Sequence, residues 1–176
     1  MTAVDPRSFL PACRFEPTLP LDTQALVFVD TAGLRAAAQA SIEGVSFFEV
    51  CETLSSFAGI SLILLDEGKN EKTLPQLKAL WPEHLAERIG GAAPEWGELL
   101  TAANHGAWGE VRAFLLENHL MGAPMLCLDA RLALYPASTH KWILAWDEFL
   151  GLTRDDLAEL EKRLLALGLE KNGIEA

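Results

Sequence analysis

The chain has 176 residues, half of them hydrophobic, with a formal net charge of −11 and a pI near 4.7. This length is enough for one domain that buries its core without a disulfide or a structural metal. The acidic balance and the absence of any Lys and Arg run disfavour nucleic acid as a partner. No apolar run approaches the roughly 20 residues of a membrane span, and no signal peptide is evident, so we expect a cytoplasmic protein without a membrane segment.

The cysteines and histidines give no framework for a disulfide or a metal. Cys13, Cys51 and Cys127 are odd in number and lie far apart among apolar neighbours. Such a set favours buried thiols over disulfides or a zinc site. The four histidines show no ligand spacing with one another or with cysteine, so we interpret them as surface or locally hydrogen-bonded residues.

The first third of the chain predicts an irregular arm followed by a buried strand. Residues 1–22 hold four prolines and little periodicity, and we expect them to lie as an arm on a domain spanning 23–168. The apolar run 26–29, bounded by polar residues, is typical of a parallel strand covered on both faces. The Ala-rich stretch 33–44 predicts either a short helix or a flap. Residues 169–176 are expected to form a C-terminal tail.

A helix and a second strand follow. Ser46 and Glu49 have the spacing of a capping box, and apolar residues at helical spacing continue from there to Gly59. The apolar run 61–65 predicts a second buried strand, which ends in the polar turn 66–70.

The middle of the chain is expected to be helical. Thr73 and Gln76 form another capping box, opening a helix that Pro82 should stop or kink. Leu85 and Ile89 indicate one more helical stretch before a pair of glycines. The remaining predicted elements are, in chain order, a short helix at 96–103, a helix at 108–118, a strand at 125–128, a strand at 141–146 and a capped helix at 153–168. By period two, Trp142, Leu144 and Trp146 would share one face of the fourth strand.

Strands that alternate with helices predict an α/β fold, a Rossmann-like three-layer sandwich with a mostly parallel central sheet. Ligands of such sheets bind beyond the carboxyl ends of the strands. Asp30, Asp66 and Asp129 each follow a predicted strand, so we expect them in one region.

This ordered set resembles the haloacid dehalogenase (HAD) superfamily, and more narrowly the small HAD domain of Swiss Army Knife RNA repair proteins. The segments that carry the resemblance are 26–34, the helix ending at Gly59, 108–115, 125–129 and 145–153. The resemblance implies a HAD fold without a large cap, since only about 30 residues separate Asp30 from the second strand. The Asp-x-Ala-Gly sequence at 30–33 also resembles phosphonoacetaldehyde hydrolases, but their cap domain would not fit in that space.

The resemblance implies a phosphohydrolase site. The first Asp of the superfamily attacks a phosphoryl group and forms an aspartyl phosphate, and Asp30 matches that position. The resemblance also implies a Mg²⁺ ion held by Asp30, the carbonyl of Ala32 and Asp129. Lys69 and Trp108 are then the candidates for substrate contact.

Several family positions are replaced in this chain. Ala32 stands where the general acid and base should be, and Trp108 stands where a Lys or Arg should offset phosphoryl charge. Asp66 and Glu67 follow the second strand where a Ser or Thr should bind phosphate, and Ala130 replaces a metal-binding acid. We therefore favour a catalytically degenerate HAD-like domain that needs no cofactor and binds an unknown protein or small-molecule ligand as a regulatory protein. The alternative is a divergent Mg²⁺-dependent phosphohydrolase with Asp30 as nucleophile.

Overall fold

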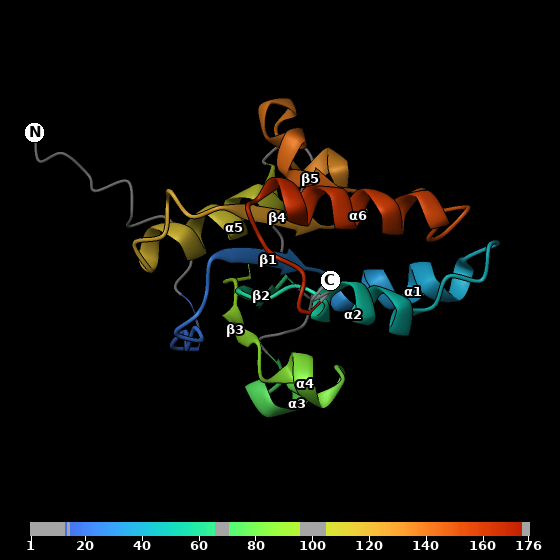
Figure 1. Ribbon diagram of the computed structural model, residues 1–176. Coiled ribbons are helices and arrows are strands. Elements are labelled where there is room, and N and C mark those ends of the chain that lie inside the picture. The colour runs from blue at the N-terminus through green and yellow to red at the C-terminus, as the bar shows by residue number, and fades with distance from the viewer. Residues whose placement is uncertain (1–12, 14, 66–70, 96–104, 174–176) are drawn as a thin grey trace, which may run out of the picture.

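A five-stranded, all-parallel sheet forms the centre of the molecule (Figure 1). The computed structural model describes residues 13, 15–65, 71–95 and 105–173. In spatial order β3-β2-β1-β4-β5, the sheet is built from β1 (Ala25–Val29), β2 (Ile60–Leu64), β3 (Ile89–Ala92), β4 (Met125–Leu128) and β5 (Ile143–Leu144). The predicted α/β, Rossmann-like three-layer sandwich is confirmed.

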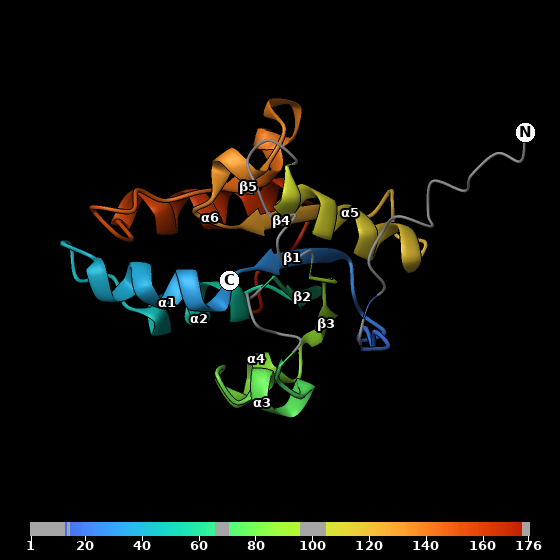
Figure 2. The same cartoon turned by 180° about the vertical axis from the view of Figure 1, so that it is seen from behind.

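Helices cover both faces of this sheet (Figures 1 and 2). Val27 and Val29 of β1 belong to a core cluster shared with α1 (Thr31–Ala40), α2 (Phe47–Ser55) and α6 (Arg154–Ala166). Leu26 and Phe28 of β1 belong to a second cluster, shared with α5 (Gly106–Glu117) and the 3₁₀ helices η4 (Leu132–Leu134) and η5 (Ala137–Trp142). Every residue of β1 is buried, as predicted for a strand covered on both faces.

The stretch between β1 and β2 is described in full, and it forms α1, α2 and their turns. No large cap is inserted there, in agreement with the sequence-based expectation. Of the two structures considered for 33–44, a helix forms, and it begins at Thr31 directly after β1. In the described part of the chain, no helix is both long enough and apolar enough to cross a membrane.

Three predicted helix starts are confirmed by reciprocal hydrogen bonds. At α2, the Glu49 amide donates to Ser46 Oγ at 3.2 Å, and the Ser46 amide donates to Glu49 Oε2 at 2.8 Å. The same capping box opens α3 (Leu74–Lys78) at Thr73 and opens α6 at Thr153. Each box satisfies amide donors that the first helical turn leaves without partners, which explains why these starts follow from local sequence.

The helical stretch predicted from Leu85 and Ile89 is confirmed only in α4 (Glu83–Ala86), and its continuation through Ile89 is wrong. The chain turns after α4, and Ile89 begins the edge strand β3. The two glycines of β3 let the N-terminal segment pack against it: a Cβ on Gly90 would lie 2.5 Å from a methyl carbon of Leu19. The Thr18 amide donates to the Gly90 carbonyl at 2.8 Å. This strand depends on a distant segment, so glycines that usually weaken a strand form one here.

Two further predictions need correction. The helix that opens at Thr73 ends at Lys78, before Trp81. The fourth predicted strand is only two residues long, because η5 occupies the chain up to Trp142. Leu144 and Trp146 pack in the α6-side cluster, whereas Trp142 packs in the α5-side cluster, so the three do not share one face. The predicted turn at 66–70 and helix at 96–103 lie outside the described residues.

Candidate functional site

The point where the strand order reverses lies between β1 and β4. From β1 the chain proceeds to β2 and β3 on one side, and β4 and β5 lie on the other. Val29 pairs with Leu128 in the parallel register, so Asp30 and Asp129 leave the sheet side by side. In open α/β sheets ligands bind in this crevice, at the carboxyl ends of the strands. The expectation that Asp30 and Asp129 lie in one region is confirmed, while Asp66 lies outside the described residues.

Asp30 is the N-cap of α1. Its Oδ1 accepts a hydrogen bond from the Gly33 amide at 3.1 Å, and its side chain is 14% exposed. Gly33 leaves room for this carboxylate: a Cβ there would collide with Asp30 Oδ2 and would lie 3.0 Å from Asp30 Cγ. The glycine of the Asp-x-Ala-Gly sequence therefore has a local structural reason. A carboxylate at this position also interacts favourably with the positive end of the helix dipole.

Asp129 is completely buried and is held by a fork of hydrogen bonds. Its Oδ1 accepts from the Arg131 backbone amide and from Arg131 Nε, both at 2.9 Å. Its Oδ2 accepts from Arg131 Nη2 and from the Tyr135 hydroxyl, again at 2.9 Å. A buried carboxylate is costly unless it is paired and hydrogen-bonded, and Arg131 and Tyr135 provide both.

Arg131 also faces Asp30. Its Nε lies 3.9 Å from Asp30 Oδ2, so one guanidinium lies between two carboxylates. Burial lowers the pKa of Arg131, but the hydrogen bonds to Asp129 and the charges of Asp129 and Asp30 outweigh that effect and raise this pKa above its usual value. Burial likewise raises the pKa of Tyr135, so its hydroxyl keeps the proton that it donates to Asp129. Arg131 is therefore a protonated cation that is held at the ends of β1 and β4.

A cavity of about 330 Å³ opens over this group of charges. One wall is formed by small side chains of α1, and the opposite wall comes from the segments that follow β4 and β5. The lining residues are Asp30, Gly33, Ala36, Ala37, Ala40, Ala130, Arg131, Trp146 and Glu148. We call this cavity the Asp30 pocket.

The residues around the Asp30 pocket, as arranged, do not fit a magnesium ion. Mg²⁺ requires oxygen ligands in near-octahedral geometry at about 2.0–2.1 Å. Both oxygens of Asp129 already accept hydrogen bonds from Arg131, and the cation beside Asp30 is a guanidinium. Within the described ranges, no group of three or more His, Cys, Asp and Glu side chains is placed to hold a metal.

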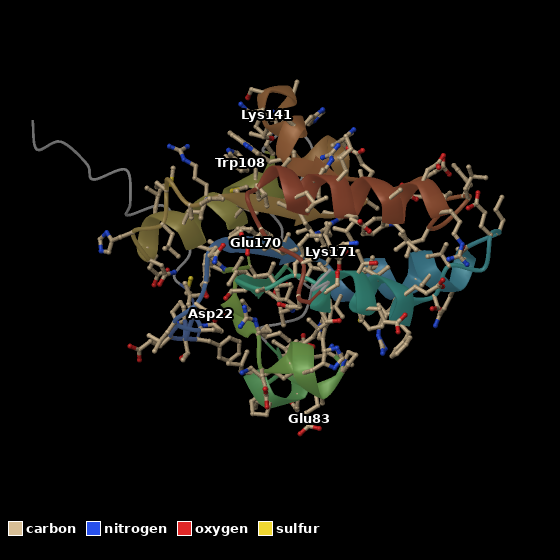
Figure 3. All side chains as sticks on the ribbon, viewed as in Figure 1. Asp22, Glu83, Trp108, Lys141, Glu170 and Lys171 are labelled. Atoms are coloured by element: carbon tan, nitrogen blue, oxygen red, sulfur yellow. The ribbon has the colours of Figure 1, made fainter. Side chains whose placement is uncertain are left out.

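Trp108, one of the two predicted substrate contacts, does not line this pocket. Trp108 on α5 stacks on Trp142, with ring centroids 5.9 Å apart and an interplanar angle of 15°. The Lys141 ammonium lies 4.5 Å from the centroid of the Trp142 ring, and Figure 3 shows Lys141 and Trp108 on the same side of the molecule. A substrate contact by Trp108 stays a prediction, and Lys69 lies outside the described residues.

Sequence reasoning missed the roles of Arg131, Tyr135 and Glu148. The signal that could have indicated the first is its spacing, because a cation two residues after Asp129 can fold back onto that carboxylate. Tyr135 and Glu148 reach the site through the turns after β4 and β5, and no local pattern marks them.

The three thiols are expected to react slowly in the folded protein. Cys51 and Cys127 are buried, as predicted, and Cys13 is half-buried. Burial, with a smaller contribution from Glu117, raises the pKa of Cys13 to about 12, and burial raises that of Cys51 to about 12 as well. At pH 8 their thiolate fractions are roughly a thousandfold below that of a free cysteine with a pKa of about 8.5. Iodoacetamide labelling followed by mass spectrometry should show fast modification of all three thiols in urea and slow modification in buffer. Labelling of Cys13 at the free-cysteine rate in buffer would contradict this expectation.

Comparisons with known proteins give no family assignment. The chain matches no family model, no curated protein and no solved structure. The functional interpretation therefore starts from the geometry of the Asp30 pocket.

Proposed function

We propose that this protein is a catalytically degenerate HAD-like domain that binds a ligand or a protein partner at the Asp30 pocket. The observation that carries the proposal is the guanidinium of Arg131, which pairs with buried Asp129 and lies 3.9 Å from Asp30. It occupies the neighbourhood in which a phosphohydrolase of this kind would need its metal ion. In the proposed domain, the guanidinium of Arg131 takes the place of the catalytic Mg²⁺ and has a structural role.

Charge supports the loss of phosphoryl chemistry. Asp30, Asp129 and Glu148 oppose the single charge of Arg131, which leaves a formal excess of two negative charges at the pocket. A phosphate group would meet repulsion on the order of 1–4 kcal/mol for each close like-charge contact. The residue two positions after Asp30 is Ala32, which cannot transfer a proton. General acid and base assistance is commonly worth about 10²- to 10⁴-fold in rate.

The pocket itself supports a binding role. It lies at the strand-order reversal, where α/β folds place their ligands, and its volume of about 330 Å³ is large enough for a small molecule. The methyl groups of α1 and the ring of Trp146 supply apolar contact, and the excess of carboxylates favours a neutral or cationic group. An anionic ligand is disfavoured for the same reason as phosphate.

One observation favours the alternative, a divergent Mg²⁺-dependent phosphohydrolase. Asp30 and Asp129 lie at adjacent strand ends beneath an open pocket, which is the placement that the resemblance requires of a nucleophile and a metal ligand. For that activity Arg131 would have to leave Asp129 so that the ion could bind.

A phosphatase screen distinguishes the two functions. With millimolar Mg²⁺ and a panel of phosphomonoesters, we expect no turnover by the wild-type protein beyond that of the Asp30→Asn variant. We also expect Mg²⁺ to leave the wild-type melting temperature unchanged, since Asp129 is already paired. Turnover that disappears in Asp30→Asn, with the variant still folded by circular dichroism, would establish the phosphohydrolase instead.

Binding at the pocket is tested by filling it. Ala36→Leu places a larger side chain into the cavity from an exposed position on α1, and Gln39→Leu places the same apolar residue on the same helix outside the lining. In a thermal-shift screen of neutral and cationic small molecules, hits should be lost in Ala36→Leu and kept in Gln39→Leu. Hits that survive in both variants would place the binding elsewhere.

A further inference from the structure

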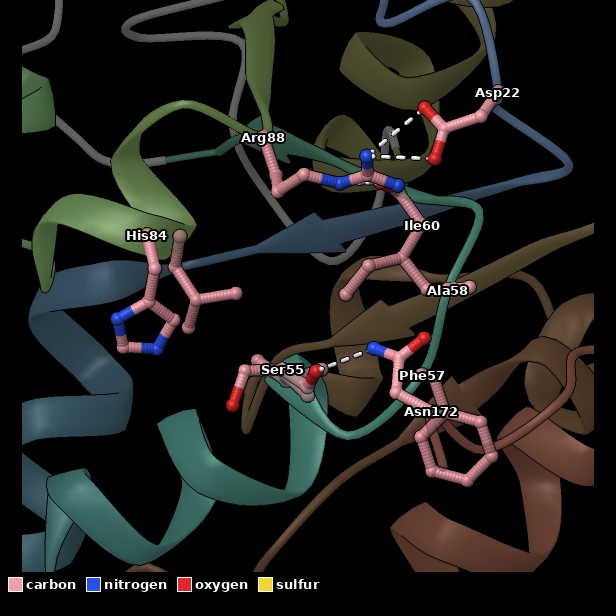
Figure 4. Close-up of a pocket in the computed structure, with 10 residues that line it drawn as sticks. Asp22, Ser55, Phe57, Ala58, Ile60, His84, Arg88 and Asn172 are labelled. Atoms are coloured by element: carbon pink, nitrogen blue, oxygen red, sulfur yellow. Dashed lines mark hydrogen bonds and ion pairs between the residues drawn. The ribbon is translucent and has the colours of Figure 1, made fainter. Parts of the chain in front are cut away.

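A second cavity, of about 240 Å³, lies at the amino ends of the strands, whereas the Asp30 pocket lies at their carboxyl ends; Figure 4 shows this second cavity in close-up. It forms where the segment between α2 and β2 meets α4, the end of the N-terminal segment and the C-terminal tail. The lining residues are Asp22, Leu54, Ser55, Phe57, Ala58, Ile60, His84, Leu85, Arg88 and Asn172. Because Ile60 begins β2, this cavity is at the amino ends of the strands and is separate from the proposed binding function at Asp30.

Arg88 in this cavity is only partly satisfied. Its Nε donates to the Ile60 carbonyl at 2.9 Å, and its Nη1 lies 2.9 Å from both oxygens of Asp22. Its Nη2 is buried and has no hydrogen-bond acceptor among the residues that the structure describes. Buried donors are nearly always paired, so this nitrogen points to an acceptor that the described part of the chain does not supply.

The contact between Arg88 and Asp22 is not the usual bidentate one. Carboxylates commonly engage two different nitrogens of a guanidinium in parallel, whereas Asp22 directs both oxygens to one nitrogen. The Asp22 side chain is 58% exposed and that of Arg88 is 23% exposed, so Asp22 can swing into solvent at little cost. The hydrogen bonds from Arg88 are the main cause that lowers the pKa of Asp22 below its usual value.

Besides Arg88 and Asp22, the cavity is lined by five apolar residues and by Ser55, His84 and Asn172. Leu54, Ile60 and Leu85 are buried and form its walls. Asp22 is its one acidic residue among the described lining side chains, in contrast to the carboxylate excess at the Asp30 pocket. Asn172 fastens the tail to the rim, because its Nδ2 donates to the Ser55 carbonyl at 3.1 Å (Figure 4).

We propose that this cavity binds a small monocarboxylate with an apolar body. The ligand carboxylate displaces Asp22 and accepts hydrogen bonds from Arg88 Nη1 and Nη2, which gives the buried Nη2 its partner. The apolar part of the ligand contacts Leu54, Ile60 and Leu85. The volume lies below the roughly 300–1,000 Å³ of sites for drug-sized ligands, so the ligand is small.

The test is a titration of ¹⁵N-labelled full-length protein with sodium benzoate, followed by NMR. The backbone amides of Ala58 and Asn172 should shift in a saturable way, while benzylammonium, with the same ring and the opposite charge, should leave them unchanged at equal ionic strength. Inorganic phosphate, an anion without an apolar body, should bind at least about tenfold more weakly than benzoate. Equal effects of benzylammonium or of phosphate would overturn the carboxylate assignment or the apolar one, respectively.

Two substitutions are expected to change affinity in opposite directions. Arg88→Gln should weaken benzoate binding by about tenfold or more, because the charge-assisted hydrogen bonds are lost. Asp22→Asn should tighten it by about two- to fivefold, because the competing charge is removed from an exposed position. Arg154→Gln, which alters an exposed ion pair with Glu49, should leave affinity unchanged.

If Arg88→Gln does not fold, Asp22→Asn still tests the proposal, since unchanged or weaker binding of benzoate by that variant would overturn it. No saturable shift with benzoate would overturn it as well and would leave water as the partner of Arg88 Nη2.

Discussion

Replacing Arg131 with alanine is expected to lower the free energy of unfolding by about 3–5 kcal/mol, the usual cost of removing one partner of a buried ion pair. Asp129 is fully buried and would keep one side-chain donor from Tyr135 in the described structure, with no cation beside it. Urea unfolding at neutral pH, followed by tryptophan fluorescence, measures the change. Arg154→Ala is the control, because its pair with Glu49 is exposed and should be worth no more than about 1 kcal/mol.

The same variant tests whether the guanidinium replaces a metal ion. In Arg131→Ala, Asp30 and Asp129 face each other without the intervening cation, so millimolar Mg²⁺ should raise the melting temperature. The wild type should not respond to Mg²⁺. Removing both charges in Arg131→Ala with Asp129→Asn should recover part of the lost stability and abolish the response to Mg²⁺. Stability of Arg131→Ala within about 1 kcal/mol of wild type would contradict the role given to this pair.

The second large effect is expected at Gly151, in the turn that joins β5 to α6. Gly151 has φ of +67°, and a Cβ there would lie 2.6 Å from the Ser41 amide nitrogen and 2.7 Å from the Ala40 carbonyl carbon. These are backbone atoms at the end of α1, and the neighbouring Leu152 amide is hydrogen-bonded to the Ala37 carbonyl at 3.1 Å. Gly151→Ala combines left-handed backbone strain of about 1–2 kcal/mol with overpacking of about 1–3 kcal/mol. We therefore expect a loss of about 2–5 kcal/mol in urea unfolding.

Gly168 supplies the matched control for this substitution. It also has a positive φ, +81°, but a Cβ there would meet nothing within 4 Å. Gly168→Ala should thus cost only the backbone strain, about 1–2 kcal/mol. The difference between the two variants measures how tightly the end of α1 packs on the turn before α6. Equal losses would mean that α1 moves away at no cost, which would contradict the close approach at Gly151.

Elements with a complete local signal were predictable from the sequence. Strands β1 and β4 are unbroken apolar runs, β2 is apolar except for Ser61, and each of the three is buried on both faces. The three capping boxes need only residues three positions apart, so they form as the sequence indicates. By contrast, β3 contains two glycines and exists as a strand because Ile89 pairs with β2 and the N-terminal segment covers the glycines.

The sequence predicted that Asp30 and Asp129 lie together, but it did not predict the side chains around them. Asp30 and Asp129 follow from the rule that parallel strands end at one edge, once the runs before them are identified as strands. Arg131 is visible in the sequence two residues after Asp129. Its role as a partner of that carboxylate follows only when Asp129 is known to be completely buried. Tyr135 and Glu148 come from segments whose paths are set by tertiary packing.

The sequence by itself determined the class of fold, the central position of a buried strand ending in Asp30, and the helix starts that surround it. It could do so because burial periodicity and helix capping are interactions between residues close in the chain. The tertiary structure alone decided that the cation beside Asp30 is a guanidinium and that the edge strand runs through glycines. It also decided that a buried donor of Arg88, at the opposite end of the sheet, has no acceptor in the described part of the chain. Each of these depends on how completely distant segments exclude water from a charge or a backbone group, and local sequence does not encode that.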